Sequence, residues 1–344
     1  MTTIIVALVF FSIIIMIHEL GHFLVAKSVG IYAEEFSIGM GPRLLKISGK
    51  DTEYSLRALP IGGYVKFLGE DDASSDPRAF GNTKVWKRMA VIVAGPIMNF
   101  LLAILLLTIM FMSFGVYESD LPVIEDVIPG YAAQLAGLLP EDRIVEVDGV
   151  DLSSMSEADA VNRIRSLIND NGANPLEISV KRDNVIQKFT VTPTLDKQNN
   201  RYQLGFYFKA KTSKPNLFKA IGLSFVQTGR IIVMMIVMLK DLIFKGVGIG
   251  DVMGPVGIVS EIGRAAQAGI QQLLNLGIVI TINLGIMNLI PFPALDGGRL
   301  TLLVVEALRG KPVDPKKEGY FHLVGFVLLM LLMIIVTYKD IIKI

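Results

Sequence analysis

The sequence predicts a multi-pass α-helical membrane protein with four transmembrane helices and a water-facing domain inserted between the second and the third. Hydrophobic residues make up 52% of the 344 residues and charged residues 19%. Such fractions coexist in one chain only when apolar and charged residues are segregated along it. Four long stretches hold at most one charged residue each, whereas residues 120–208 are charged and turn-rich. These observations exclude a disordered chain and a purely soluble enzyme.

The four predicted transmembrane helices cover residues 3–26, 91–117, 265–295 and 319–338. Each holds the roughly 20 residues that cross the hydrocarbon core of a bilayer. The first has no basic leading region and no small-residue cleavage site, so we expect an uncleaved helix rather than a signal peptide. Residues 216–244 are interrupted by Lys and Arg, which favours an amphipathic helix on the outer membrane surface.

Basic residues concentrate in two segments, residues 27–88 and 299–318. Loops rich in Lys and Arg remain in the cytoplasm. With four transmembrane helices, both segments are cytoplasmic and both chain termini lie outside. A fifth span at residues 216–244 would place the second basic segment outside, which again favours a surface helix there.

Composition also limits the chemistry. The net charge of +1 provides no field for nucleic acid. The chain has no Cys, which excludes disulfide bonds, thiolate metal sites and a cysteine nucleophile. No Ser lies beside a His in the sequence, so a covalent mechanism has no support.

Two of the three histidines lie in the first predicted span, in the motif His18-Glu19-Leu20-Gly21-His22. Residues four apart share one face of a helix, so both imidazoles can bind one metal ion while Glu19 approaches a bound water. Zinc suits such ligands, although iron and cobalt fit the same donors. Ionisable residues inside a span are costly and usually functional.

A catalytic zinc needs a third protein ligand, and the candidates are Asp296, Glu306 and His322. The first and third spans both run from outside to inside, which places the two histidines and Asp296 at the same depth. Prolines and glycines interrupt the helix over residues 288–298. Irregular backbone at membrane depth occurs only where protein or a water-filled cavity surrounds it. The sequence therefore favours Asp296, and His322 is expected to be interfacial.

The inserted region resembles a PDZ domain of the bacterial protease-associated kind in residues 129–138 and 142–149. The resemblance implies binding of an extended peptide along an exposed strand edge. A purely structural β domain is the alternative. The pattern of residues predicts four strands and one helix, at residues 123–128, 143–147, 176–181, 187–192 and 156–168.

Taken together, the motifs resemble a site-2 protease of the bacterial regulator-of-sigma-E class, an intramembrane zinc metalloprotease. The matching segments are residues 18–22, 36–42, 62–70, 95–100, 254–258 and 288–298, with the PDZ-like region. Two of them, 36–42 and 62–70, resemble the family's β elements that re-enter the membrane from the cytoplasmic side. The chain departs from the best-known members in having one PDZ domain rather than two in tandem.

The resemblance implies one zinc ion per chain, bound by His18, His22 and Asp296, with Glu19 as the catalytic acid/base. It also implies a substrate-binding role for Asn288, and further substrate-binding residues at Pro291, Asn99, Gly62 and Gly63. A transmembrane substrate is helical and must be unwound locally before attack. The strand-like segments 54–59 and 63–67 are expected to capture it as an added strand; a hairpin that only packs on the protein is the alternative.

We expect seven segments: residues 1–27, the first transmembrane helix; 28–90, the cytoplasmic loop with re-entrant β elements; 91–117, the second transmembrane helix; 118–208, the PDZ domain; 209–264, amphipathic surface helices; 265–298, the third transmembrane helix; and 299–344, a cytoplasmic loop with the fourth transmembrane helix.

The implied function is cleavage, within the bilayer of a bacterial inner membrane, of single-span substrates already trimmed outside by a site-1-type protease. In this family such substrates include anti-sigma factors and remnant signal peptides. The active site would face the cytoplasm, and no nucleic-acid partner is expected. Two alternatives remain: a metal transporter, although no inverted repeat is visible, and a catalytically idle PDZ scaffold.

Overall fold

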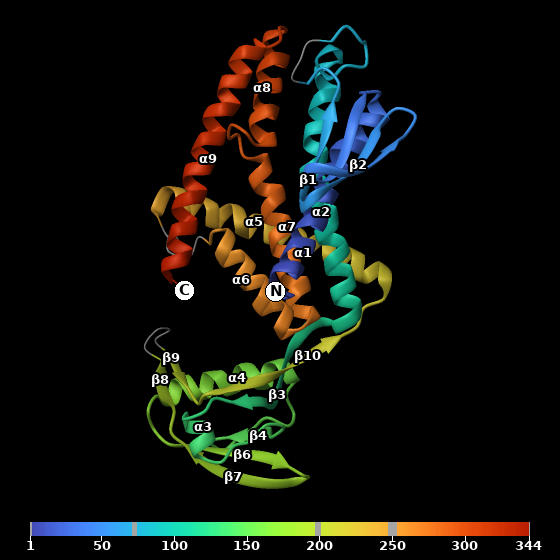
Figure 1. The fold of residues 1–344 in the computed structure, drawn as a ribbon. Coiled ribbons are helices and arrows are strands. Elements are labelled where there is room, and N and C mark those ends of the chain that lie inside the picture. Colours follow the sequence, from blue (N-terminus) through green and yellow to red (C-terminus); the bar gives the residue numbers. More distant parts are fainter. Residues whose placement is uncertain (1, 71–73, 197–200, 247–252, 344) are drawn as a thin grey trace. The chain divides into compact units, whose positions relative to one another are not determined.

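The computed structural model describes residues 2–70, 74–196, 201–246 and 253–343, and the chain folds as two compact units (Figure 1). One unit comprises Met1–Met112 and Asn216–Ile344, and the other comprises Ser113–Pro215. The predicted PDZ domain, residues 118–208, falls inside the second unit. Residues 247–252, within the predicted surface-helix segment, lie outside the described residues.

The first unit is mainly helical. Its α-helices are α1 (Thr2–Val29), α2 (Val85–Phe114), α5 (Leu217–Lys245), α6 (Pro255–Ala268), α7 (Ile270–Leu289), α8 (Asp296–Arg309) and α9 (Pro315–Lys343), and a 3-10 turn, η1, covers Phe80–Asn82. Within the described residues, five helices (α1, α2, α5, α7 and α9) are long and apolar enough to cross a membrane. The chain is thus a helical protein with several candidate spans, and α5, predicted as a surface helix, is one of them.

The third predicted span is shorter in the structure than in the prediction. Residues 265–295 do not form one helix, because α6 ends at Ala268 and α7 covers only Ile270–Leu289. Gly269, between the two helices, has a φ of 116°, a conformation that favours glycine. At the other end, the helix stops ahead of Pro291 and Pro293, as the two prolines predicted.

A β hairpin, β1 (Ala33–Ser48) and β2 (Glu53–Phe67), packs on α1 (Figure 1). Residues 53–56 pair with two parts of β1, 35–38 and 45–48, while 63–67 pair with 33–38 from the other side. Among the described residues, no further strand pairs with 63–67. This segment is therefore an edge of the sheet, with backbone groups open to another strand.

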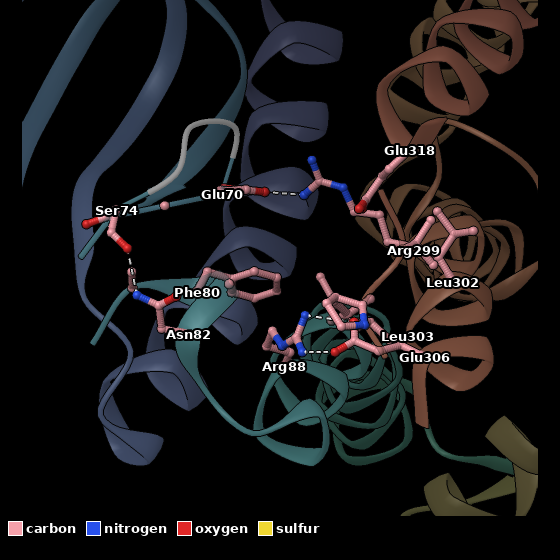
Figure 2. Close-up of a pocket in the computed structure, with 16 residues that line it drawn as sticks. Glu70, Ser74, Phe80, Asn82, Arg88, Arg299, Leu302, Leu303, Glu306 and Glu318 are labelled. Atoms are coloured by element: carbon pink, nitrogen blue, oxygen red, sulfur yellow. Dashed lines mark hydrogen bonds and ion pairs between the residues drawn. The ribbon is translucent and has the colours of Figure 1, made fainter. Parts of the chain in front are cut away.

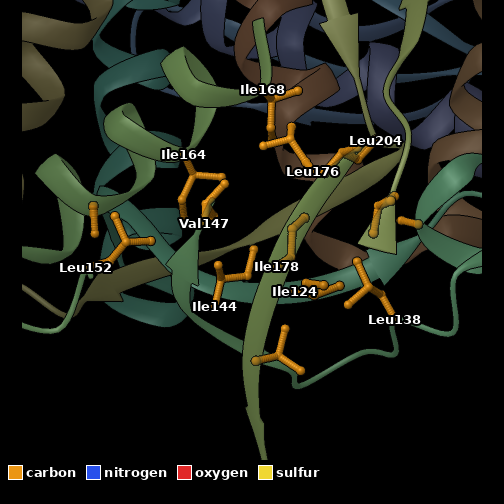
Figure 3. Close-up of a cluster of buried hydrophobic side chains, with 14 residues drawn as sticks. Ile124, Leu138, Ile144, Val147, Leu152, Ile164, Ile168, Leu176, Ile178 and Leu204 are labelled. Carbon is orange, nitrogen blue, oxygen red and sulfur yellow. The ribbon is translucent and has the colours of Figure 1, made fainter. Parts of the chain in front are cut away.

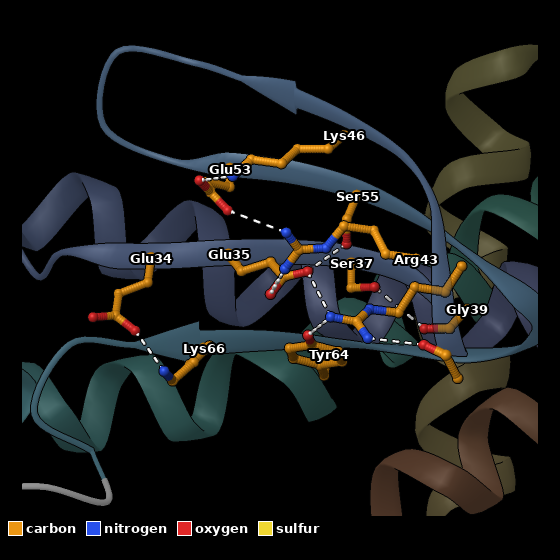
Figure 4. Close-up of polar contacts among 12 residues, drawn as sticks. Glu34, Glu35, Ser37, Gly39, Arg43, Lys46, Glu53, Ser55, Tyr64 and Lys66 are labelled. Carbon is orange, nitrogen blue, oxygen red and sulfur yellow. Dashed lines mark hydrogen bonds and ion pairs between the residues drawn. The ribbon is translucent and has the colours of Figure 1, made fainter.

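A buried carboxylate, Glu35, organises the hairpin (Figure 4). It accepts a hydrogen bond from the Ser55 hydroxyl, and its two oxygens receive Arg57 Nη2 at 2.9 Å and Arg43 Nη2 at 3.2 Å. The Arg57 guanidinium also donates to the Tyr64 hydroxyl. A buried charge is tolerated only when it is paired in this way, so the network links both strands of the hairpin.

The described residues of the second unit form β strands and two helices. The elements are β3 (Val116–Val127), α3 (Ala132–Leu135), β4 (Arg143–Val147), β5 (Val150–Asp151), α4 (Glu157–Asn171), β6 (Leu176–Arg182), β7 (Val185–Val191), β8 (Thr194–Asp196), β9 (Arg201–Gln203) and β10 (Phe206–Ser213). The main sheet has the order β10-β3-β4-β6-β7. Its core contains Ile124, Ile144, Ile164 and Ile178, all at most 1% exposed (Figure 3). The other predicted strands and the predicted helix match β4, β6, β7 and α4 within three residues at each end, whereas β3 begins seven residues before the predicted 123–128.

Candidate metal centre

Three acceptor atoms converge where α1 meets the start of α8. His18 and His22 are buried side chains of α1, and Asp296 is the first residue of α8. Asp296 Oδ2 lies 3.1 Å from His18 Nε2 and 3.4 Å from His22 Nε2, and the two Nε2 atoms are 3.2 Å apart. The structure thus brings together three residues that are 4 and 274 positions apart along the chain.

The orientation of the His22 ring is fixed by the backbone of α2. Its Nδ1 lies 2.8 Å from the carbonyl oxygen of Val91, which can only accept a hydrogen bond. Nδ1 therefore carries the proton, and Nε2 presents a lone pair toward Asp296 and His18. This is the arrangement by which backbone carbonyls fix metal-binding histidines.

The side-chain amide of Asn99 on α2 contacts the other imidazole. Asn99 Nδ2 lies 3.1 Å from His18 Nδ1, while the buried Oδ1 has no partner among the described residues. If the amide group turns by 180°, Oδ1 accepts from Nδ1–H, and His18 Nε2 then also presents a lone pair.

These contacts test whether a metal ion fits. Two imidazole lone pairs and a carboxylate oxygen repel one another at this separation, and within the described part of the chain no group donates a hydrogen bond to Asp296 Oδ2. A buried acceptor without a donor is costly. A cation removes the repulsion, and two imidazoles with one carboxylate are a donor set typical of catalytic zinc. The residues present therefore fit zinc.

Glycines allow the helices to approach this closely. A Cβ atom on Gly95 of α2 would overlap His22 Nε2 and lie 2.8 Å from His18 Cε1. One on Gly21 of α1 would overlap the carbonyl oxygen of Ala94, and one on Gly297 would lie 2.5 Å from the backbone of Leu289. Only a residue without a side chain fits at these three points.

Glu19 lines a cavity of about 400 Å³ next to the metal-binding residues. The cavity is lined by Glu19, His22, Tyr64, Val65, Lys66, Phe67, Glu70, Ile92, Asp296 and Arg299. The edge segment 63–67 forms one of its walls. The backbone of Val65 lies next to Glu19, and a Cβ atom on Gly63 would lie 3.8 Å from Glu19 Cγ.

The remaining predicted substrate-binding residues differ in position. Asn288 Nδ2 lies 3.3 Å from His18 Nε2, so Asn288 borders the metal site. Asn99 is fully buried against His18. Pro291 is exposed in the segment that follows α7. Gly62 has a φ of 74° beside Gly63 on the hairpin.

The two alternative third ligands are occupied elsewhere. Glu306 forms a bidentate ion pair with Arg88, with Nη1 and Oε2 3.1 Å apart. His322 Nδ1 accepts a hydrogen bond from the backbone N–H of Ala294 at 3.0 Å. Sequence reasoning missed the Val91 carbonyl, which carries no residue-type signal. It also missed Arg299 in the cavity wall, although its position one helical turn after Asp296 was visible.

A helix that bears two imidazoles of a candidate metal site and a glutamate, in a chain with several apolar helices of membrane-spanning length, is typical of a membrane metalloprotease. The model of Peptidase family M50 matches residues 6–332, and the chain belongs to this family, the site-2 proteases. It is a zinc-dependent metalloendopeptidase.

Relatives from several bacteria match along almost the whole chain. A protein of Clostridium acetobutylicum whose name describes a zinc metalloprotease is 39% identical over 339 residues, covering 98% of this chain and 97% of the relative. Zinc metalloprotease RasP of Geobacillus kaustophilus is 31% identical, covering 98% and 97%. Regulator of sigma-W protease RasP of Bacillus subtilis is 29% identical, covering 98% of each chain.

Proposed function

We propose that this protein hydrolyses peptide bonds within the transmembrane segments of single-span substrates, using a zinc ion held by His18, His22 and Asp296. The convergence of these three acceptors is the observation that carries the proposal, together with the lack of a hydrogen-bond donor to Asp296 Oδ2 among the described residues. When bound, zinc supplies Lewis-acid chemistry that activates a water molecule and polarises the scissile carbonyl.

The residues of the chain handle the protons and the orientation. Glu19 takes a proton from the attacking water and returns it to the leaving amine, acting first as base and then as acid. Its place in the cavity wall next to His22 and Asp296 suits both roles. Asn99 and the Val91 carbonyl orient the two imidazoles, so we assign Asn99 a positioning role.

The edge segment 63–67 is the proposed binding surface for the unwound substrate. Its backbone is open on the side of the cavity, and Val65 and Gly63 lie next to Glu19. An extended peptide that adds to this edge exposes its backbone carbonyls, which a helix would keep bonded. Asn288, beside His18, is placed to hold a carbonyl of the added strand.

In the second unit, we propose a PDZ domain that binds peptides. Strand β10 lies at the edge of the main sheet, and a groove of about 560 Å³ is lined by residues of α4 and β10, among them Asn169 and Phe208. An edge strand beside a helix is the surface to which PDZ domains add a peptide strand.

The proposed topology has four transmembrane helices, α1, α2, α7 and α9, with the termini and the PDZ domain outside and the zinc site toward the cytoplasm. The PDZ domain and α5 would exclude substrates that retain a bulky outer domain. The substrates would be proteins trimmed beforehand by a site-1-type protease, such as anti-sigma factors and remnant signal peptides.

The test compares purified wild type with Glu19→Gln on a transmembrane peptide in detergent micelles. We expect the variant to retain zinc and lose cleavage, because it keeps the shape of Glu19 but not the base. Glu177→Gln is the matched control, since it removes an exposed carboxylate that pairs with Lys188 in the second unit. Undiminished cleavage by Glu19→Gln would refute the assigned role.

A further inference from the structure

We propose that Glu70 and Arg299 form a clasp that fixes the edge segment 63–67 relative to the metal ligand Asp296. Both are positioning residues for peptide-bond hydrolysis. This inference rests on the proposed function, because it concerns how the substrate-binding edge is held against the zinc site.

Glu70 joins two parts of the chain through its two carboxylate oxygens. Oε2 accepts a hydrogen bond from the backbone N–H of Phe67, the last residue of β2, at 3.3 Å. Oε1 forms an ion pair with Arg299 Nη1 of α8 (Figure 2). The Glu70 side chain is 12% exposed, so the pair is largely shielded from water on that side.

The clasp connects the substrate edge to the helix that carries Asp296. Arg299 follows Asp296 by three residues on α8, so both lie on one face of the helix. Phe67 follows Val65 by two residues on β2, and Val65 and Glu19 line the same cavity. A shift of the Glu70–Arg299 contact therefore changes the distance between the substrate edge and the metal ligand.

The pair also forms part of the wall between two cavities. Glu70, Ile92 and Arg299 line the active-site cavity, and the same three residues line a second cavity of about 290 Å³. Figure 2 shows the second cavity, where the Arg88–Glu306 ion pair ties α2 to α8. Because α8 has this second anchor, loss of the clasp should release the β2 edge while Asp296 stays in place.

A released edge places the scissile bond less accurately, and misplacement by about 1 Å can lower a rate about 100-fold. Strand binding can also slip in register, because the edge offers repeated backbone groups. We therefore expect slower cleavage together with additional cleavage at neighbouring peptide bonds. Substrate capture itself, which uses the backbone of the edge, should change less than kcat.

The experiment is a double-mutant cycle on the full-length protein, with Glu70→Gln, Arg299→Gln and the combination of both. Cleavage of a transmembrane peptide gives kcat and KM, mass spectrometry of the products gives the cleaved bonds, and metal analysis gives zinc per chain. We expect each single variant to lose about 10- to 100-fold in kcat with zinc retained. The double variant should lose no more than the worse single variant, because one contact is removed only once.

Arg299→Lys keeps the positive charge and should recover most of the rate and the single cleavage site. Glu177→Gln, which removes an exposed ion pair with Lys188 in the second unit, should behave as wild type. Three results would each overturn the clasp: fold-losses in kcat that multiply in the double variant, single variants with unchanged kcat, or loss of zinc. In each case, cleavage by wild type would still support the protease assignment. If Glu70→Gln fails to fold, the comparison of Arg299→Lys with Arg299→Gln decides the matter alone.

Discussion

Replacing Gly95 with alanine should damage the proposed zinc site without replacing any of its proposed ligands. The added Cβ would overlap His22 Nε2 and lie 2.6 Å from His22 Cε1, whereas ordinary contacts are at least 3.4 Å. The imidazole must therefore retreat by roughly 1 Å, while a metal site tolerates displacements of only about 0.5 Å. We expect zinc affinity to fall about 100-fold, which corresponds to about 2.7 kcal/mol.

The assay is competition for zinc with a chelator of known affinity, followed by cleavage of the transmembrane peptide at saturating zinc. Gly222→Ala in α5 is the matched control, because nothing lies within 4 Å of its added Cβ. The control should gain up to about 1 kcal/mol of stability from helix propensity and keep its zinc. If Gly95→Ala binds zinc with an affinity within about twofold of that of wild type, the close contact between α2 and the His22 ring does not control zinc binding.

Three further predictions concern other contacts. Burial opposes ionisation of Glu35, but the hydrogen bonds from Ser55 and Arg57 outweigh it and lower the pKa of Glu35 to about 2. The ionised carboxylate therefore stabilises the fold fully above the unfolded-state pKa of about 4.3. Between pH 5 and pH 2, wild type should lose on the order of 2 kcal/mol of stability relative to Glu35→Gln, and parallel melting curves of the two proteins would contradict this. Asp142 is 1% exposed and accepts two hydrogen bonds of 2.7 Å from Arg182. Asp142→Asn should therefore lower the free energy of unfolding by about 3 kcal/mol and speed proteolysis within Ser113–Pro215. Equal digestion rates of variant and wild type would contradict this. Asp340 accepts hydrogen bonds from the backbone N–H groups of Gly254 and Gly257 at the start of α6. Asp340→Ala should therefore reduce stability by about 1 kcal/mol and lower the melting temperature. Asp241→Ala, which removes a surface ion pair with Lys245, should leave the melting temperature unchanged.

The local patterns carried most of what could be predicted from sequence. The spacing of His18 and His22 requires only that α1 be helical, which its apolar composition ensures. Asp296 was predicted from chain orientation and from the helix-breaking residues around it. Both arguments use properties that a helix or a loop has by itself, so they needed no knowledge of tertiary packing.

The missed features depend on pairings between distant segments. Residues 53–56 pair with two parts of β1, because irregularities in β1 let it fold back on both sides of them. Such a register depends on irregular backbone, which no local sequence pattern predicts. Arg299 and Glu70 are 229 residues apart, so no local pattern joins them. The break at Gly269 is likewise invisible in composition, since both flanks are apolar.

The central claim is that Asp296 is the third zinc ligand, and zinc content after purification tests it most directly. Asp296→Ala and His322→Ala each remove one of the candidates that the sequence offered, and they serve as controls for each other. We expect about one zinc per chain in wild type and in His322→Ala, and a loss of zinc in Asp296→Ala. Full zinc in Asp296→Ala with loss in His322→Ala would contradict the account.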